Sequence, residues 1–209
     1  MRLQSGDKIL FIGDSITDAG RREDPDGLGQ GYVRMFRDVL AARHPSLVVD
    51  VVNQGIGGDT IRDLDRRWQS DVLAHRPTWL SISIGVNDVW RQLQTPRNPD
   101  EVMIDEFEAT YRRLLTPVVK ELHCKLLLLE PGINGETLDT PHNKLTGPYV
   151  QCVNALAAEF KATLVPINRA FWNAIHANPS RKWTADGVHP SSNGHMLMAL
   201  AVYDALDAN

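Results

Sequence analysis

Five short runs rich in Val, Ile and Leu recur along the chain, and longer stretches with helical spacing separate them. The runs cover residues 8–12, 47–52, 79–84, 125–129 and 163–167. Most of them are continuously apolar rather than alternating in polarity, which is typical of strands covered on both faces in a parallel sheet. Combined with right-handed crossovers, this alternation predicts an α/β fold: a three-layer α/β/α sandwich around a five-stranded parallel sheet.

Apolar residues three and four positions apart predict the intervening helices. The patterns are Val33, Phe36 and Leu40; Ile61, Leu64, Trp68 and Val72; Phe107, Tyr111, Leu114, Leu115, Val118 and Leu122; Val150, Val153, Leu156 and Phe160; and Met196, Ala199, Leu200, Tyr203 and Leu206. Pro117 lies inside the third pattern and predicts a kink or a break there. Because no repeat, low-complexity tract or linker divides the sequence, we expect one domain over residues 1–209.

Charge and composition argue against several classes of protein. With 22 basic and 26 acidic residues the net charge is -4, and no Lys or Arg cluster is long enough to follow a phosphate backbone. We therefore expect no nucleic-acid partner. The apolar runs fall far short of the roughly 18 residues that cross a bilayer, so no membrane partner is expected. Two cysteines form no disulfide framework, and the first residues leave no room for an export signal, which together predict a cytoplasmic protein.

Four irregular segments interrupt the pattern, and they indicate where a site would lie. They span residues 18–31, 86–100, 131–148 and 178–190. Three of them follow a predicted strand and so lie at its carboxyl end, where ligands bind in open parallel sheets. We therefore expect the functional side chains at this edge of the sheet.

The first predicted strand ends in Gly13-Asp14-Ser15, which places Ser15 where the strand gives way to a turn. Glycine before the serine permits a tight turn that leaves the hydroxyl exposed beside outward-pointing backbone N–H groups. Ser15 is therefore a candidate nucleophile, although a helix N-cap is the more frequent explanation for an isolated serine of this kind. The chain has neither the Gly-x-Ser-x-Gly turn of α/β-hydrolases nor a Gly-rich phosphate loop with Lys.

A base for this serine is available near the other end of the chain. Asp186 and His189 stand three residues apart in a predicted loop. One turn can bring the carboxylate to Nδ1 of the imidazole, which leaves Nε2 free to take the serine proton. An Asx turn with a capping histidine is the alternative. A metal set of Asp14, Asp18, Asp186 and His189 lacks a Glu, a Cys or a second nearby His, so no metal is expected.

Donors for a developing oxyanion follow the second and third predicted strands. Gly58, just before a helix, can present its backbone N–H without a side chain in the way. Asn87 can point its side-chain amide at the same place. Taken singly, both residues also fit ordinary turns, because Gly-Gly and Asn-Asp are common turn dipeptides.

The four pieces together form a more specific pattern. In chain order they are Gly13-Asp14-Ser15; Asn53 with Gly55 and Gly58; Gly85-Val86-Asn87-Asp88; and Asp186-Gly187-Val188-His189. In order, spacing and strand context the chain resembles the SGNH hydrolases, the GDSL-like esterase and lipase superfamily, over essentially its whole length. Ile16 stands where the family's name expects Leu, an exchange of similar volume.

Further segments resemble the intracellular carbohydrate acetyl esterases of the acetylxylan esterase type within this superfamily. They are Gly31-Tyr32-Val33; Thr60-Ile61-Arg62-Asp63-Leu64; Gly85-Val86-Asn87-Asp88-Val89-Trp90-Arg91; and Val188-His189-Pro190-Ser191 followed by Gly194-His195. The resemblance implies a flavodoxin-like SGNH hydrolase fold and a catalytic triad of Ser15, His189 and Asp186. It also implies an oxyanion hole of the Ser15 and Gly58 backbone N–H groups and the Asn87 side chain, without a cofactor.

The residues that would contact the substrate are less clearly marked. Trp90 and Trp183 flank the predicted site, and indole faces suit stacking against sugar rings. Tyr32 is a further candidate at the same rim. Asp14 either orients the site or stabilises the turn and the following helix, and we favour the structural role.

Two other polar residues near these motifs are expected to be structural. Asp88 is predicted to be a cap or loop anchor. His195 falls within the last predicted helix and is expected to have a packing or surface role rather than a catalytic one.

The sequence therefore predicts a serine esterase that removes acetyl or other short acyl groups from an acylated carbohydrate, such as a xylo-oligosaccharide. The alternatives are a short-chain acyl esterase, lysophospholipase or thioesterase of the same superfamily, and a carbohydrate-binding protein without turnover. No loop is hydrophobic enough for the lid of a long-chain lipase, which favours short acyl groups. A homo-oligomer is compatible with the sequence, but no feature predicts its subunit number.

Overall fold

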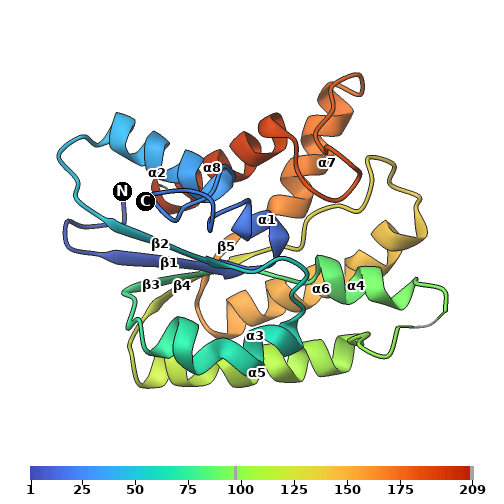
Figure 1. Cartoon of the computed structure of the whole chain (residues 1–209), viewed down its shortest axis with the longest axis horizontal. Helices are drawn as coiled ribbons and strands as arrows, with labels where there is room; N and C mark the ends of the chain where they lie inside the picture. Colours follow the sequence, from blue (N-terminus) through green and yellow to red (C-terminus); the bar gives the residue numbers. More distant parts are fainter. Residues whose placement is uncertain (97, 208–209) are drawn as a thin grey trace.

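The computed structural model describes residues 1–96 and 98–207, and its centre is a five-stranded parallel sheet (Figure 1). The strands are β1 (Lys8–Gly13), β2 (Asp50–Gly55), β3 (Trp79–Ser83), β4 (Lys125–Leu129) and β5 (Thr163–Val165). Their order across the sheet is β2-β1-β3-β4-β5, which is the flavodoxin-like order. The strand order reverses between β1 and β3, and the crevice at such a point is where ligands bind in this class of sheet.

Helices cover both faces of the sheet and give the predicted three layers (Figure 1). One face carries α1 (Ser15–Asp18), α2 (Tyr32–Arg43), α7 (Ile167–Ala177) and α8 (Ser192–Asp207). The other carries α3 (Ile61–Trp68), the π-helical turn η1 (Gln69–Leu73), α4 (Val86–Gln92), α5 (Ile104–Lys120) and α6 (Pro141–Glu159). The α/β class and the three-layer α/β/α sandwich with a five-stranded parallel sheet are confirmed.

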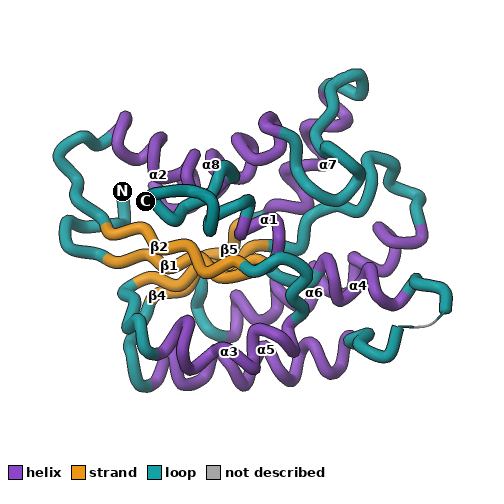
Figure 2. The backbone as a smooth tube through the Cα atoms, viewed as in Figure 1, coloured by secondary structure: helices purple, strands orange, loops and turns teal. Residues whose placement is uncertain are grey.

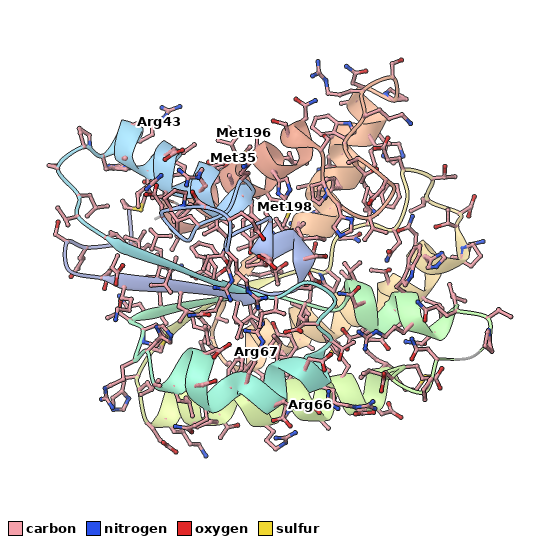
Figure 3. The ribbon with its side chains drawn as sticks, viewed as in Figure 1. Met35, Arg43, Arg66, Arg67, Met196 and Met198 are labelled. Atoms are coloured by element: carbon pink, nitrogen blue, oxygen red, sulfur yellow. The ribbon has the colours of Figure 1, made fainter. Side chains whose placement is uncertain are left out.

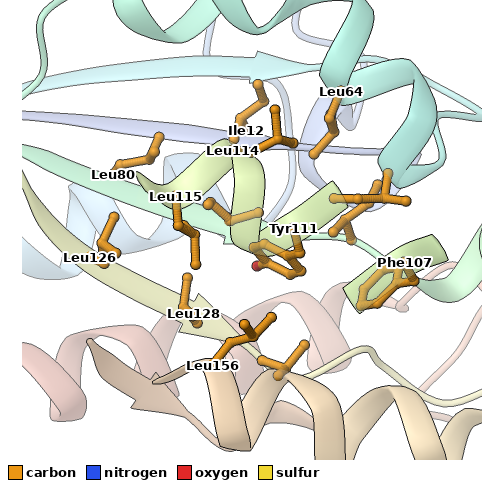
Figure 4. Packing of buried hydrophobic residues seen from close by; sticks show 14 of the residues in the cluster. Ile12, Leu64, Leu80, Phe107, Tyr111, Leu114, Leu115, Leu126, Leu128 and Leu156 are labelled. Carbon is orange, nitrogen blue, oxygen red and sulfur yellow. The ribbon is translucent and has the colours of Figure 1, made fainter. Parts of the chain in front are cut away.

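Successive side chains of each strand enter opposite layers, and both layers are apolar. Leu10 and Ile12 of β1 pack in the layer of α3, α5 and α6, whereas Ile9 and Phe11 pack in the layer of α2, α7 and α8. Figure 4 shows the first layer, where strand side chains meet leucines of α5 and α6. Because both faces are buried, both sets of alternate residues must be apolar, which explains the continuous runs in the sequence.

Two strands, β2 and β5, differ from the prediction by more than one residue at an end. The second strand was expected at residues 47–52, but β2 spans Asp50–Gly55. β2 lies at the edge of the sheet, where Val48 before it remains 72% exposed, so apolar character does not mark its beginning. The last strand is shorter than residues 163–167, because Pro166 ends β5 and α7 begins at Ile167.

Pro117 does not break its helix. α5 continues from Ile104 to Lys120 with Pro117 in its last turns, so the predicted break is wrong. A proline inside a helix removes one N–H donor. Near the carboxyl end this loss affects a single bond, and the helix still closes with a hydrogen bond from Glu121 N–H to the Pro117 carbonyl.

Two helices begin inside segments that the apolar pattern predicted to be irregular. α6 begins at Pro141 within residues 131–148, where the Thr140 side chain accepts a hydrogen bond from Asn143 N–H at 3.2 Å. α4 begins at Val86, directly after the turn at Gly85. A cap and a proline at the first helical position start α6, so periodicity alone cannot place its beginning.

Cys124 and Cys152 are buried free thiols. Among the helices of residues 1–96 and 98–207, none combines the length and the apolar character that crossing a bilayer requires.

We expect Leu128→Ala to lower the free energy of unfolding by about 2–5 kcal/mol, because Leu128 is fully buried in the centre of the sheet and its truncation leaves a cavity. Val48→Ala at the exposed edge should change it by less than about 0.5 kcal/mol. Urea unfolding followed by circular dichroism measures both. Equal effects of the two substitutions would contradict this packing.

Candidate active site

Ser15 is presented by a tight turn at the end of β1. Asp14 is buried and its Oδ1 accepts a hydrogen bond from Ile16 N–H at 3.0 Å, which caps α1. A Cβ atom on Gly13 would lie 2.3 Å from the Ser83 carbonyl oxygen and 2.4 Å from Thr17 Oγ1, so only glycine fits. The turn therefore leaves the strand at once, and α1, which begins at Ser15, follows β1 directly at the carboxyl edge of the sheet (Figure 2).

Ser15, His189 and Asp186 form a hydrogen-bonded series. Ser15 Oγ lies 2.9 Å from His189 Nε2, and His189 Nδ1 lies 2.7 Å from Asp186 Oδ2. The hydrogen bond with His189 and two backbone N–H donors lower the pKa of Asp186 to about 2, so its carboxylate is ionised at neutral pH. An ionised carboxylate accepts from Nδ1–H, which leaves Nε2 as the acceptor for the serine proton.

The loop that carries Asp186 and His189 is fixed by hydrogen bonds at its base. Ala185 N–H donates to the His189 carbonyl at 2.8 Å, and Asp186 Oδ1 accepts from the backbone N–H groups of Val188 and His189. Glu136 Oε1 accepts three hydrogen bonds from the stem of the loop, at 2.7–2.8 Å. These donors lower the pKa of Glu136. The loop is thus held as a rigid unit over the sheet edge.

The segment that follows β2, residues 55–59, lies next to Ser15 and is called the oxyanion loop here. A Cβ atom on Gly57 would lie 3.9 Å from Ser15 Cβ, so the loop and the serine are neighbours. Gly58 is exposed and has φ +84°, a conformation that favours glycine. The Asn87 side-chain amide donates to the Asp59 carbonyl at 3.0 Å, which joins α4 to this loop. The structure therefore brings together the predicted oxyanion donors Ser15, Gly58 and Asn87.

A cavity of about 320 Å³ opens beside the series of Ser15, His189 and Asp186. Its lining is Asn87, Trp90, Asp186, Val188 and His189. Trp90 is 39% exposed, and its ring stacks on His142 with a centroid distance of 4.6 Å and an interplanar angle of 25°. The cavity thus has a polar wall that includes Asp186 and His189 and a flat aromatic wall formed by Trp90.

Two predicted substrate contacts are placed in the protein interior instead. Tyr32 is fully buried, packs edge-on against Phe11, and its hydroxyl lies 3.1 Å from Thr17 Oγ1, so its prediction as a rim residue is wrong. Tyr32 is the first residue of α2 and faces the sheet, which local sequence does not indicate. Asp14 is 2% exposed and caps α1, so the structure gives it the structural role that we favoured rather than contact with substrate.

Trp183 and His195 lie beside the site without lining the cavity described above. Trp183 is partly buried and lines a separate hollow of about 250 Å³ with residues of α8 such as Met196 and Leu200. His195 Nδ1 accepts a hydrogen bond from Tyr32 N–H at 3.2 Å and so caps α2. Burial, followed by the charge of His189, lowers the pKa of His195 to about 4. Of the two roles expected for His195, packing or surface, this placement agrees with packing.

The alternative metal set is not assembled. Within residues 1–96 and 98–207, no three His, Cys, Asp or Glu side chains lie where they could hold one metal ion. Asp14 and Asp186 accept from backbone N–H groups, as described above. Asp18 accepts from the backbone N–H groups of Arg21 and, in the oxyanion loop, of Gly57.

Sequence reasoning missed three residues that shape this site, namely Glu136, His142 and Arg67. Each acts on a partner distant in sequence: Glu136 on residues 47 and 48 positions away, His142 on Trp90, and Arg67 on Gly13. None of them belongs to a local motif, so no pattern in the sequence could have indicated them.

The three-layer fold, with serine, histidine and aspartate in hydrogen-bonded series at the strand ends, is the arrangement of a serine hydrolase. The family model of the GDSL-like Lipase/Acylhydrolase family matches residues 11–197. The chain belongs to this family, and it is a carboxylic ester hydrolase with the SGNH hydrolase fold.

Similar proteins agree with this assignment. The chain is 42% identical over 208 residues to the acetylxylan esterase of Geobacillus stearothermophilus, covering 96% of this chain and 94% of that protein. The crystal structure of Axe2, an acetylxylan esterase from the same organism, has a TM-score of 0.92 at 38% identity and covers 100% of this chain and 98% of that one. An Escherichia coli protein described as thioesterase, protease and lysophospholipase is 26% identical, covering 95% of this chain and 82% of that protein.

Asp88 was predicted to be a cap or loop anchor, and the structure shows it as a cap. Its Oδ1 accepts from Ile61 N–H at 3.0 Å, at the beginning of α3. Its Oδ2 is buried and has no hydrogen-bond partner among residues 1–96 and 98–207. Burial, followed by smaller effects such as the charge of Asp14, raises the pKa of Asp88 to about 7. The folded state therefore favours the protonated side chain.

Because the folded pKa of Asp88 lies above its ordinary value of 3.8, its contribution to stability is complete below that value and is lost as pH rises through about 7. We expect Asp88→Asn, which keeps the acceptor without the charge, to gain stability relative to the unsubstituted protein as pH rises from about 4.5 to 8. Urea unfolding at several pH values measures this. The exposed Asp139→Asn is the control, and identical pH dependence in both variants would contradict the expectation.

Proposed function

We propose that this protein is an acetyl esterase that removes acetyl groups from acetylated xylo-oligosaccharides or closely related sugars, through a triad of Ser15, His189 and Asp186. The observation that carries the proposal is the 2.9 Å contact between Ser15 Oγ and His189 Nε2, a residue that lines the cavity. The 42% identity to an acetylxylan esterase supports the choice of substrate.

The mechanism follows from the hydrogen bonds. His189 Nε2 takes the Ser15 proton as Oγ attacks the ester carbonyl, and Asp186 stabilises the imidazolium that forms. The carbonyl oxygen, now negatively charged, is held by the Ser15 and Gly58 backbone N–H groups and the Asn87 amide. The bond between the carbonyl carbon and the sugar oxygen then breaks, and the sugar oxygen takes the proton from His189 and leaves as a hydroxyl group. Water then attacks the acetyl-enzyme, with His189 as base again, and acetate and free Ser15 result.

The cavity supports a short acyl group on a sugar. About 320 Å³ is at the small end of ligand pockets and holds a small acyl group with part of its alcohol. Trp90, whose ring is held by stacking on His142, lines the cavity, and indole rings stack against the apolar faces of sugar rings. Trp90 is therefore assigned to substrate binding.

A thioesterase or lysophospholipase is the second candidate, because a protein with those activities is 26% identical over 95% of this chain. Rates on acetate and octanoate esters, followed by acetate release from acetylated xylan, distinguish the two. A carbohydrate-binding protein without turnover would give no burst of acyl-enzyme formation. Cytoplasmic location and assembly into a homo-oligomer stay predictions from the sequence.

We expect Ser15→Ala to lower kcat on aryl acetates by a factor on the order of 10⁵ to 10⁶ and to abolish labelling by a serine-directed phosphonate, because the nucleophile is gone. Mass spectrometry of the labelled protein should locate the phosphonate on Ser15. The exposed Ser192→Ala, at the start of α8, is the matched control and should keep both properties. Labelling that persists in Ser15→Ala would show that another residue is the nucleophile.

We expect Trp90→Ala to raise KM for acetylated xylo-oligosaccharides about three- to tenfold, because a stacked aromatic contact contributes on the order of 1 kcal/mol. KM for 4-nitrophenyl acetate, which carries no sugar, should change by less than about twofold. Leu93→Ala, an exposed residue at the end of the same helix, is the control. An equal rise of KM for both substrates would argue against a sugar-binding role.

A further inference from the structure

Arg67 is a charged residue of α3 that lies against the sheet rather than in solvent. Its side chain is 13% exposed, whereas that of its neighbour Arg66 is 66% exposed. Figure 3 shows Arg67 between α3 and the sheet and Arg66 at the outer side of the helix. Removing a guanidinium group from water costs free energy unless its N–H groups find hydrogen-bond acceptors. The acceptors of Arg67 therefore show which segments the side chain connects.

The guanidinium group reaches four acceptors, which lie in β1, β2, the oxyanion loop and η1. They are the Gly13 carbonyl at 3.0 Å, the Gln54 carbonyl at 2.7 Å, Asp59 Oδ2 at 2.7 Å and Asp71 Oδ2 at 2.9 Å. The first two acceptors are backbone groups near the ends of β1 and β2, and the third belongs to the oxyanion loop. One side chain thus joins two strand ends and the oxyanion loop.

Two of these contacts, those with Gly13 and Asp59, are adjacent to groups that the proposed reaction needs. Gly13 lies two residues before Ser15 on the same turn. Asp59 directly follows Gly58, and its own carbonyl accepts the hydrogen bond from the Asn87 amide. Through Asp59, Arg67 is therefore connected to Gly58 and Asn87, the two predicted oxyanion donors that do not belong to the turn of Ser15.

The oxyanion loop needs such an external anchor. A Cβ atom built on Gly58 would meet nothing within 4 Å in the described part of the chain, so side-chain packing does not hold this residue. Hydrogen bonds hold the loop instead: Asp18 accepts from Gly57 N–H, Arg91 donates to the Gly58 carbonyl, and Arg67 donates to Asp59. Gly57 and Gly58 also have no side chains with which to bind neighbours. Because glycine has no Cβ atom, its backbone can adopt many conformations. Contacts from neighbouring residues must therefore restrict the backbone if the N–H groups are to point steadily at the oxyanion.

We propose that Arg67 is a positioning residue for the oxyanion hole: its hydrogen bonds to Gly13, Gln54 and Asp59 hold the Gly58 N–H and the Asn87 amide in register with Ser15. The proposal rests on the proposed function, because it assumes that these groups stabilise a tetrahedral intermediate. A lysine cannot replace the arginine, since a single ammonium group lacks the planar fork that reaches several acceptors at once.

The first test compares Arg67→Lys with Arg66→Lys, which makes the same exchange one residue away on the exposed side of α3. With 4-nitrophenyl acetate, Arg67→Lys should lower kcat about 10- to 100-fold at nearly constant KM, because misplaced donors lose transition-state binding. Arg66→Lys should stay within about twofold. Wild-type kcat in a folded Arg67→Lys protein would overturn the proposal.

The second test separates positioning from a general loss of structure. Arg67→Lys is introduced into the Asn87→Ala variant, whose oxyanion hole already lacks one donor. If Arg67 acts through that hole, its substitution should cost much less in this background than in the unsubstituted protein. If the fold-loss of kcat in the double variant equalled the product of the two single losses, the proposal would be overturned, because Arg67 would then act independently of the Asn87 amide.

If near-ultraviolet circular dichroism shows that Arg67→Lys does not fold, Asp59→Asn serves as the second variant. This variant keeps the shape of the partner and removes its charge, and it should also lower kcat about 10-fold or more at nearly constant KM. Unchanged kcat would overturn the proposal. A wild-type protein that neither hydrolyses esters nor reacts with a phosphonate would instead refute the proposed function, so the two failures are distinguishable.

Discussion

The contact between Ser15 and His189 joins residues 174 positions apart, and the site depends on it. It forms because β1 ends at the switch point of the sheet, where the turn at Gly13 presents the serine, and because the loop of Asp186 and His189 closes over the same edge. Neither side chain could hold the other in place by itself. The sheet fixes the serine, and hydrogen bonds to Glu136 fix the base of the loop that carries the histidine.

Buried carboxyl groups hold the helix ends near this contact. Asp14 caps α1, and Asp88 caps α3 from the helix that carries Asn87. Burial raises the pKa of both carboxyl groups to about 7, whereas hydrogen bonds lower that of the partly exposed Asp186 to about 2. Two aspartates therefore hold helix ends, while a third stays charged to stabilise the imidazolium. The difference in environment assigns different tasks to one kind of side chain.

Much of the fold was predictable, because parallel strands covered on both faces must be apolar throughout, as Ile9 to Ile12 show. The prediction failed where burial does not control the sequence. β2 lies at the edge and begins three residues later than expected, and α6 begins at Pro141, directly after the capping Thr140, rather than at an apolar repeat. The candidate triad was predictable from short motifs. Tyr32 was misplaced because no local pattern reveals which side of a helix start faces the sheet.

The sequence by itself determined the layered α/β fold and the chemical groups of the candidate site, because apolar periodicity and motif chemistry are local properties of the chain. Tertiary structure alone decided which of these groups meet. The distance between Ser15 and His189, the burial of Asp14, the stacking of Trp90 on His142 and the bonds of Arg67 all join segments far apart in sequence. Such contacts depend on how the layers pack, and packing is a property of the whole chain.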